Sequence, residues 1–329
     1  MRLPDFEYIE PTSIDEACLF LKDHGQESKV IGGGTDLLPS MKQNIFRPKY
    51  LVSLSKIPNL DRVEFNEGSG LRIGPSARLR TLEKSPIIQE KYPMIRQAAS
   101  DVGSLQLRQM GTVGGNVCLD TRCTYYNQSS FWRKCRPTCV KMGGDICNAI
   151  GGGKKCFAVF SGDLAPALMA LGATIELRSA KGGRTLPLSD LYTGNGAKPL
   201  ALNPEEVLVG VQIPSLPKGS LGGYFKYRIR KAIDYPLASV ALLIRLEGKE
   251  KMCREARLVI GAVGSKPQEV KGIGELLVGK KIEGRTVEEA SDLAFKASRP
   301  VGNTSSTPSY RKRMIKILTK RSLEQVLRS

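Results

Sequence analysis

Cysteine is concentrated in one part of this chain, and that concentration limits what the chain can fold around. Six of its eight cysteines fall in a single segment, and the sequence contains one histidine. Thiolates without imidazoles suit an iron–sulfur cluster or a zinc ion held by four cysteines. None of the six forms a CxxC pair, which disfavours a zinc ribbon or a thioredoxin-like site. An iron–sulfur cluster, a zinc site and unligated thiols all stay open at this point. The six are Cys118, Cys123, Cys135, Cys139, Cys147 and Cys156.

The single histidine, His24, removes whole classes of mechanism. A zinc site with two histidines and a 2-His-1-carboxylate iron site are both excluded. His24 precedes Gly25 at the expected end of a helix that starts near Ser13. We expect it to be a surface residue favoured by the helix dipole, without a catalytic role.

Two glycine-rich segments point to a bound nucleotide. An apolar strand at residues 29–31 runs directly into Gly32, Gly33 and Gly34, and a second glycine segment covers residues 111–116. Successive glycines expose backbone N–H groups that can form a nest for a pyrophosphate. Neither segment is a Walker A or a GxGxxG motif, so a Rossmann fold is not indicated. Together they could hold the two ends of one dinucleotide.

Length and composition favour a cytoplasmic protein of two or three domains. The chain has 329 residues, and 41% of them are hydrophobic, enough for a sizeable core. No apolar run reaches the roughly 18 residues that span a bilayer, and residues 1–11 lack the apolar core of a signal peptide. Many cysteines in a cytosolic chain indicate metal binding or catalysis rather than disulfides.

The strong positive charge suggests an acidic partner. The formal net charge is +18, but aromatic residues make up only 6% of the chain and no nucleic-acid-binding signature is present. We therefore expect no nucleic acid and no membrane. An acidic electron carrier or an acidic sister subunit fits the charge better.

Hydrophobic periodicity predicts an α+β protein. Strands are expected at residues 6–10, 29–31, 50–54, 71–75, 173–178 and 205–214, with a hairpin turn at residues 181–184. Residues 214–219 read as a linker. Beyond it, three strands at residues 222–230, 237–246 and 256–263 precede helices at residues 269–277, 287–298 and 307–328. Strands followed by helices indicate an α+β C-terminal domain.

Three motifs together resemble a known family. They are the segment from Val30 to Asp36, the segment from Thr112 to Asn116, and residues 161–168, which contain Asp163. They are similar to the FAD-binding subunits of the xanthine dehydrogenase family, which include the medium subunits of CO dehydrogenases. This resemblance implies a two-part FAD-binding domain over residues 1–217, with a small βαβ subdomain (1–57) and a larger α+β subdomain (58–217). A C-terminal α+β domain would cover residues 218–329.

The resemblance also implies which residues bind FAD. The backbone of both glycine segments would hold the pyrophosphate, Asp163 would accept a hydrogen bond from a ribityl hydroxyl, and Leu208 and Lys226 would line the flavin. For Lys226, a side chain pointing to solvent is the alternative. The implied set is Val30, Ile31, Gly32, Gly33, Gly34, Thr35, Asp36, Leu37, Val102, Thr112, Val113, Gly114, Gly115, Asn116, Asp163, Leu208 and Lys226.

The cysteine-rich segment is an insertion relative to most of that family. It covers about residues 119–158 and resembles the β subunits of 4-hydroxybenzoyl-CoA reductases, which carry a [4Fe-4S] cluster. The resemblance implies Cys123, Cys139, Cys147 and Cys156 as ligands, with Cys135 as an alternative to Cys139. Cys118 belongs to the second glycine segment.

The implied function is electron transfer within a molybdenum enzyme, with no catalytic residue in this chain. Electrons would pass from a ferredoxin through the [4Fe-4S] cluster and FAD to a small [2Fe-2S] subunit. A large molybdenum subunit would then dehydroxylate 4-hydroxybenzoyl-CoA, in a dimer of heterotrimers. Two alternatives remain. One is the FAD subunit of a related hydroxylase that passes electrons out to NAD or quinone, and the other is a non-redox zinc-binding module.

Overall fold

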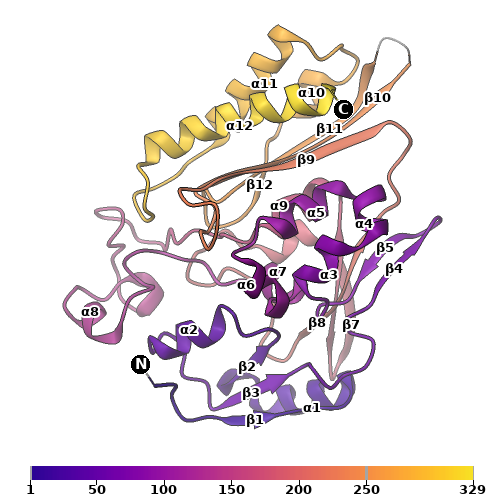
Figure 1. The fold of residues 1–329 in the computed structure, drawn as a ribbon. Coiled ribbons are helices and arrows are strands. Elements are labelled where there is room, and N and C mark those ends of the chain that lie inside the picture. Colours follow the sequence, from indigo (N-terminus) through magenta and orange to yellow (C-terminus); the bar gives the residue numbers. More distant parts are fainter. Residues whose placement is uncertain (1, 249–250, 329) are drawn as a thin grey trace.

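The computed structural model describes residues 2–248 and 251–328, which form three tiers (Figure 1). The first tier is a parallel sheet in the order β1-β3-β2, with helices α1 and α2. These elements are β1 (Glu7–Ile9), α1 (Ile14–His24), β2 (Ser28–Ile31), α2 (Leu37–Lys42) and β3 (Tyr50–Ser53).

Helix α1 begins where its sequence predicts. The Ser13 hydroxyl accepts a hydrogen bond from the Glu16 N–H at 3.1 Å, which caps the first turn. The expected place of His24 is wrong in part. His24 is half-buried, and the centre of its ring lies 4.7 Å from the centre of the Phe20 ring and 4.9 Å from that of the Tyr50 ring. The histidine therefore completes an aromatic cluster beside the first sheet.

The second tier is an antiparallel sheet in the order β4-β5-β8-β6-β7, with short helices packed against it. Its strands are β4 (Val63–Asn66), β5 (Gly70–Ile73), β6 (Thr174–Ser179), β7 (Gly182–Pro187) and β8 (Val207–Ile213). Its helices are α3 (Leu79–Lys84), α4 (Pro86–Lys91), α5 (Pro93–Ser100), α6 (Leu105–Met110), α7 (Val113–Val117) and α9 (Leu164–Ala170). The β6–β7 turn is tighter than expected, because Ser179 already pairs with Gly182.

The third tier is an antiparallel sheet in the order β12-β11-β10-β9. Its elements are β9 (Ser220–Tyr227), β10 (Ala238–Glu247), β11 (Met252–Gly261), β12 (Gln268–Glu269), α10 (Ile273–Leu277), α11 (Gly284–Ala297) and α12 (Pro308–Arg328). Helices α10 and α12 contact one face of this sheet, with α11 packed against both helices, while α5 and α9 of the second tier contact the other face (Figure 1). The helix predicted from residue 269 starts later, because Glu269 pairs with Val259 in β12.

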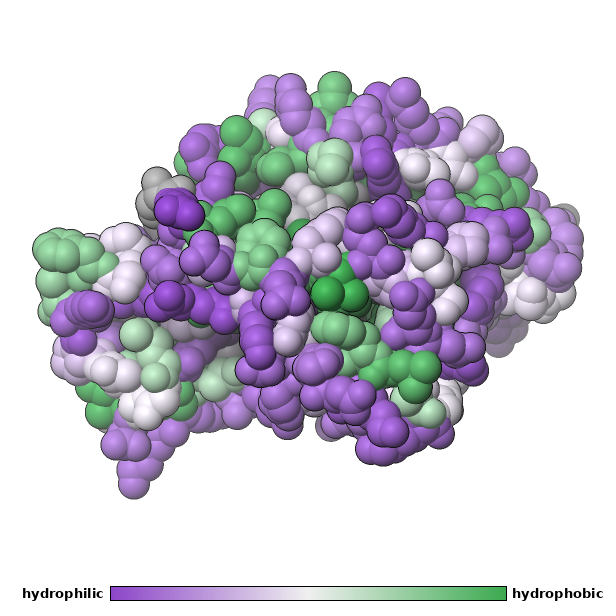
Figure 2. Space-filling view, turned by 90° about the horizontal axis from the view of Figure 1, so that it is seen from below, coloured by the Kyte–Doolittle hydropathy of each residue, from purple (hydrophilic) through white to green (hydrophobic). Residues whose placement is uncertain are grey.

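The predicted α+β class is confirmed by this arrangement. Within the described ranges, no helix is both long and apolar enough to cross a bilayer. Hydrophilic residues cover most of the face seen in Figure 2, with hydrophobic residues scattered among them. That distribution agrees with the many charged residues of the sequence.

The cysteine-rich segment has little regular structure. Helix α8 (Ser130–Lys134) and single-residue bridges, such as Arg122 with Val159 and Cys139 with Ile146, hold its loops together. It extends to one side of the three tiers, between the first and the third (Figure 1). The position of this segment therefore depends on contacts between its loops and the tiers beside it, and not on a sheet of its own.

Candidate functional site

A cleft of about 810 Å³ runs between the first and second tiers. Both glycine segments line it, together with Ser76 and Leu79 from the second tier and Tyr235 from the loop that follows β9. Its volume lies within the usual range for cofactor pockets of roughly 300–1,000 Å³. The cleft is thus large enough for a dinucleotide.

The first glycine segment presents unused hydrogen-bond donors to this cleft. In the described part of the chain, the backbone N–H groups from Gly32 to Asp36 donate to no protein acceptor. Gly34 has a φ of 69°, a left-handed conformation that favours glycine. A row of free N–H groups along a cleft suits a phosphate, because several backbone donors can bind one anion together.

The second glycine segment is organised differently. It forms the short helix α7, and the Thr112 hydroxyl caps that helix by accepting from the Gly115 N–H at 3.1 Å. The N–H of Val113 donates to Ala77 and that of Gly114 donates to Pro75, so neither is free. This segment packs closely against the first one, since a Cβ on Gly33 would lie 3.0 Å from Gly111 Cα and 1.8 Å from the carbonyl oxygen of Met110, which precedes the segment.

Asp163 lines the cleft and forms a buried ion pair with Lys226. Asp163 lies at the start of α9, and Lys226 reaches it from β9 with an Nζ to Oδ2 distance of 3.1 Å. The Tyr224 hydroxyl donates to the other carboxylate oxygen at 2.6 Å. Burial raises the pKa of the Asp163 carboxyl, and Lys226 and Tyr224 offset part of that rise. The same burial, with the Asp163 charge, raises the pKa of Tyr224.

Most of the residues implied for FAD line the cleft, including Val102, Asn116, Asp163 and Leu208. Val113 and Lys226 do not line it, and the Val113 side chain is buried in the core of the second tier. Lys226 is buried against Asp163, so the alternative that it points to solvent is wrong. The flavin contacts themselves stay a prediction.

Four cysteines surround a second, small pocket beside the cleft. They are Cys123, Cys139, Cys147 and Cys156, the set implied by the resemblance. Burial, and to a smaller extent the charges of the other three cysteines, raises the pKa of the Cys123 thiol to about 11.

The remaining two cysteines of the segment lie elsewhere. Cys135 is exposed, and its thiol contacts the Phe131 carbonyl oxygen at 3.5 Å. Cys118 lines the large cleft, and burial raises its pKa to about 12. Cys135 and Cys139 were the two alternatives for one ligand position, and the structure brings only Cys139 of the two to the pocket.

The four thiols do not converge on one point. In the ranges that the structure describes, no group of three or more histidine, cysteine, aspartate or glutamate side chains is arranged to hold a metal ion. Four cysteines thus line one pocket without forming a site for a single metal ion among the described residues.

Several residues of the site escape sequence reasoning. The Asp36 carboxylate accepts from Arg122 at 2.7 Å and from the Tyr235 hydroxyl at 2.9 Å. The Arg122 guanidinium also stacks on the Tyr235 ring, 4.5 Å from its centroid. This contact joins the first glycine segment, the cysteine-rich segment and the third tier. Asp36 belongs to the first glycine segment, whereas no local pattern marks Arg122 or Tyr235, which are far from it in the chain.

Lys141 is a further residue that spacing does not reveal. Its side chain is 4% exposed, and it lines both the cysteine pocket and the large cleft. Burial raises the pKa of Cys156, and the charge of Lys141 counteracts part of that rise. The only signal in the sequence is a lysine two residues after Cys139.

Comparisons with known proteins agree with the dinucleotide cleft. A family described as the FAD binding domain in molybdopterin dehydrogenase matches residues 4–216, and the CO dehydrogenase flavoprotein C-terminal domain matches residues 223–326. The chain is 31% identical to the FAD-binding subunit of aldehyde oxidoreductase from Escherichia coli, over 74% of this chain and 77% of that protein. It is 28% identical to the nicotine 6-hydroxylase medium subunit of Paenarthrobacter nicotinovorans, over 98% of each.

The fold supports the same relationship. A chain of CO dehydrogenase from Hydrogenophaga pseudoflava matches with a TM-score of 0.81 and 25% identity, over 99% of both chains. Two family matches cover nearly all of the sequence, and most of the residues that line the cleft lie within the first of them. This chain therefore belongs to the FAD-binding medium subunits of molybdenum hydroxylases, the family of xanthine dehydrogenase and CO dehydrogenase, and is an oxidoreductase subunit.

Proposed function

We propose that this chain holds a [4Fe-4S] cluster as well as FAD and transfers electrons between them. The observation that carries this proposal is the gathering of Cys123, Cys139, Cys147 and Cys156 around one pocket, with Cys135 left outside. Four thiolates are the usual ligands of such a cluster, and Cys139 and Cys156 are buried. The residues present fit the group.

FAD occupies the large cleft in this proposal. The free N–H groups from Gly32 to Asp36 bind its pyrophosphate, and Asp163 and Leu208 approach the flavin end. FAD can exchange either one or two electrons, so it connects one-electron carriers to two-electron chemistry. The protein contributes orientation and charge, and Lys226 keeps the Asp163 carboxylate in place.

The proposed assembly contains a small [2Fe-2S] subunit and a large molybdenum subunit, in a dimer of heterotrimers. The chain divides near residue 217 into an FAD-binding part and a C-terminal part. The proposed reaction of the whole enzyme is the reductive dehydroxylation of 4-hydroxybenzoyl-CoA. The support for that substrate is the cysteine-rich insertion, since the substrate site lies on another subunit.

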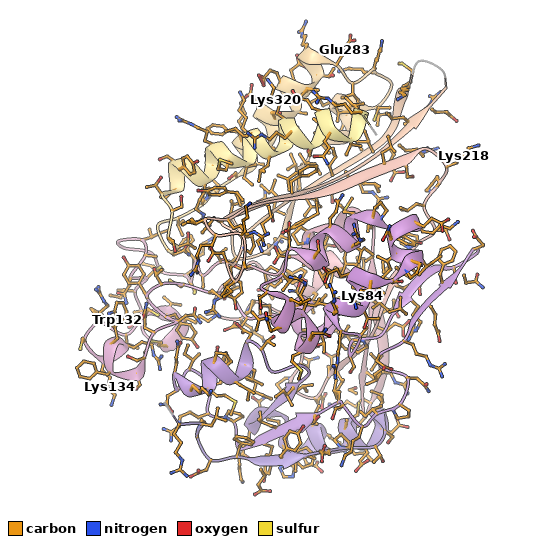
Figure 3. The ribbon with its side chains drawn as sticks, viewed as in Figure 1. Lys84, Trp132, Lys134, Lys218, Glu283 and Lys320 are labelled. Atoms are coloured by element: carbon orange, nitrogen blue, oxygen red, sulfur yellow. The ribbon has the colours of Figure 1, made fainter. Side chains whose placement is uncertain are left out.

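An acidic ferredoxin is the proposed electron donor. The net charge of +18 favours an acidic partner, and the cysteine-rich segment carries its own basic and aromatic surface. Phe131 is 81% exposed, and Trp132 and Lys134 point outward from α8 (Figure 3). We expect the rate of cluster reduction by ferredoxin to fall steeply as salt is raised. A rate that is independent of salt contradicts this part of the proposal.

A different candidate is the FAD subunit of a hydroxylase that passes electrons out to NAD. The named relatives, such as nicotine 6-hydroxylase, favour it. Oxygen-free mixing with NADH separates the two, because bleaching of the flavin by NADH supports the hydroxylase. The alternative of a non-redox zinc-binding module is contradicted by the match of residues 4–216 to an FAD binding domain.

The deciding experiment is the iron, sulfide, zinc and flavin content of the chain purified without oxygen. The proposal expects about four irons and four sulfides for each FAD. Cys147→Ser should lose iron and keep FAD, whereas Cys135→Ser, the matched control at an exposed cysteine, should keep both. Flavin without iron in the wild-type protein refutes the cluster.

A further inference from the structure

Two residues form the partition between the cysteine pocket and the FAD cleft. Lys141 and Tyr126 line both cavities. The Lys141 ammonium lies 5.0 Å from the centre of the Tyr126 ring, and both side chains are nearly inaccessible to water. A positive charge therefore sits between the places proposed for the two redox groups.

The Lys141 ammonium is held firmly in this position. It donates to the Asp120 carboxylate at 2.8 Å, to the Thr121 hydroxyl at 2.6 Å and to the carbonyl oxygens of Thr121 and Gly196 at 3.0 and 2.9 Å. Only one of these acceptors carries a full charge, and its side chain is 25% exposed. The lysine charge is thus fixed by the protein and only partly compensated.

This charge acts on the cysteine pocket at short range. Lys141 follows Cys139 by two residues, and its side chain lines the same pocket as Cys139 and Cys156. The neighbouring backbone is tightly packed, since the Gly196 N–H donates to the Cys156 carbonyl at 3.1 Å. The Lys141 side chain is only 4% exposed, so solvent screens its charge weakly.

We propose that Lys141 is the residue that sets the reduction potential of the cysteine-held cluster, a role that rests on the function proposed above. Reduction adds one electron from a one-electron donor, and no bond forms or breaks. A fixed positive charge nearby stabilises the added negative charge and so raises the potential. Lys141 lines both the cysteine pocket and the FAD cleft, and its charge there makes reduction of the cluster more favourable.

The test is an EPR-monitored redox titration of the complete protein, purified without oxygen, with dithionite as reductant. Lys141→Met should make the reduction equilibrium at least about tenfold less favourable, a fall of about 59 mV for a one-electron couple. Lys141→Arg keeps the charge and should stay near wild type. Lys154→Met is the matched control, because Lys154 is exposed and lies two residues before Cys156.

A second variant keeps the proposal testable if Lys141→Met loses its iron. Asp120→Asn removes the compensating carboxylate, so the potential should rise. An unchanged potential in Lys141→Met with full iron, or in Asp120→Asn, overturns the proposal. Absence of iron in the wild-type protein refutes the proposed function instead, so the two failures are distinguishable.

Discussion

The carboxylate of Asp163 and the ammonium of Lys226 lie 3.1 Å apart, with side chains only 4% and 1% exposed. Asp163 starts α9 of the second tier, and Lys226 belongs to β9 of the third. Lys226 also donates to the Asp101 carbonyl oxygen at 2.8 Å. This ion pair therefore joins the two tiers beside the cleft, which Asp163 lines.

Breaking this pair from one side should destabilise the protein strongly. Lys226→Met leaves a buried carboxylate without its cation, which costs about 3–5 kcal/mol of unfolding free energy. Asp163→Asn combined with Lys226→Met should cost less than Lys226→Met alone, because no charge is left unpaired. Urea unfolding measures both, with Arg285→Gln, in an exposed pair with Glu289, as a nearly silent control. A double variant that is less stable than Lys226→Met contradicts this account.

The contact between the two glycine segments should be intolerant of any side chain. A Cβ at Gly33 falls 1.8 Å from the Met110 carbonyl oxygen, so Gly33→Ala must push the segments apart. We expect at least a tenfold loss of bound FAD, read from flavin absorbance per protein. Gly284→Ala adds its Cβ in open space and should bind FAD normally. Full flavin in Gly33→Ala would show that the segments are not the phosphate site.

The packing of Gly196 against Cys156 predicts a selective loss of iron. A Cβ at Gly196 lies 2.9 Å from the Cys156 sulfur and 2.7 Å from the Ala158 nitrogen. Gly196→Ala should displace this cysteine and lower the iron content several-fold while FAD is retained. Gly151→Ala, in the same segment but with open space around it, is the control. Equal iron content in the two variants would show that Cys156 is not a ligand of the cluster.

An ion pair in the second tier should make stability depend on pH. Arg72 on β5 donates to Glu176 on β6 across β8, with one N to O distance of 2.7 Å. Arg72 lowers the pKa of Glu176 below its usual 4.5. The pair therefore stabilises the fold above pH 4.5, and this contribution is lost as the pH falls through the lowered pKa.

The measurement is the unfolding free energy of wild type and Glu176→Gln across this pH range. The pair is partly exposed, so the expected difference at pH 7 is about 1 kcal/mol or less. It should shrink toward zero in acid. A difference that grows as the pH falls has the wrong sign for this mechanism.

Local structure followed from the sequence wherever it depends on neighbouring residues. Ser13 caps α1 through a side chain three residues from its partner, and the alternation around Val207 and Val211 places β8. The glycines from Gly32 to Gly34 were recognisable because conformational freedom belongs to the residue itself. The α+β class was recognisable for the same reason, since strands and helices differ in hydrophobic period.

Tertiary structure alone decided which side chains meet. Spacing did not separate Cys135 from Cys139, but the loops leave the first exposed and bring the second to the pocket. Lys226 could have pointed to solvent from an alternating strand, and packing against α9 buries it on Asp163. Lys141 looked like one basic residue among many. Such pairings join segments far apart in the chain, so they are set by how the tiers pack and leave no local pattern in the sequence.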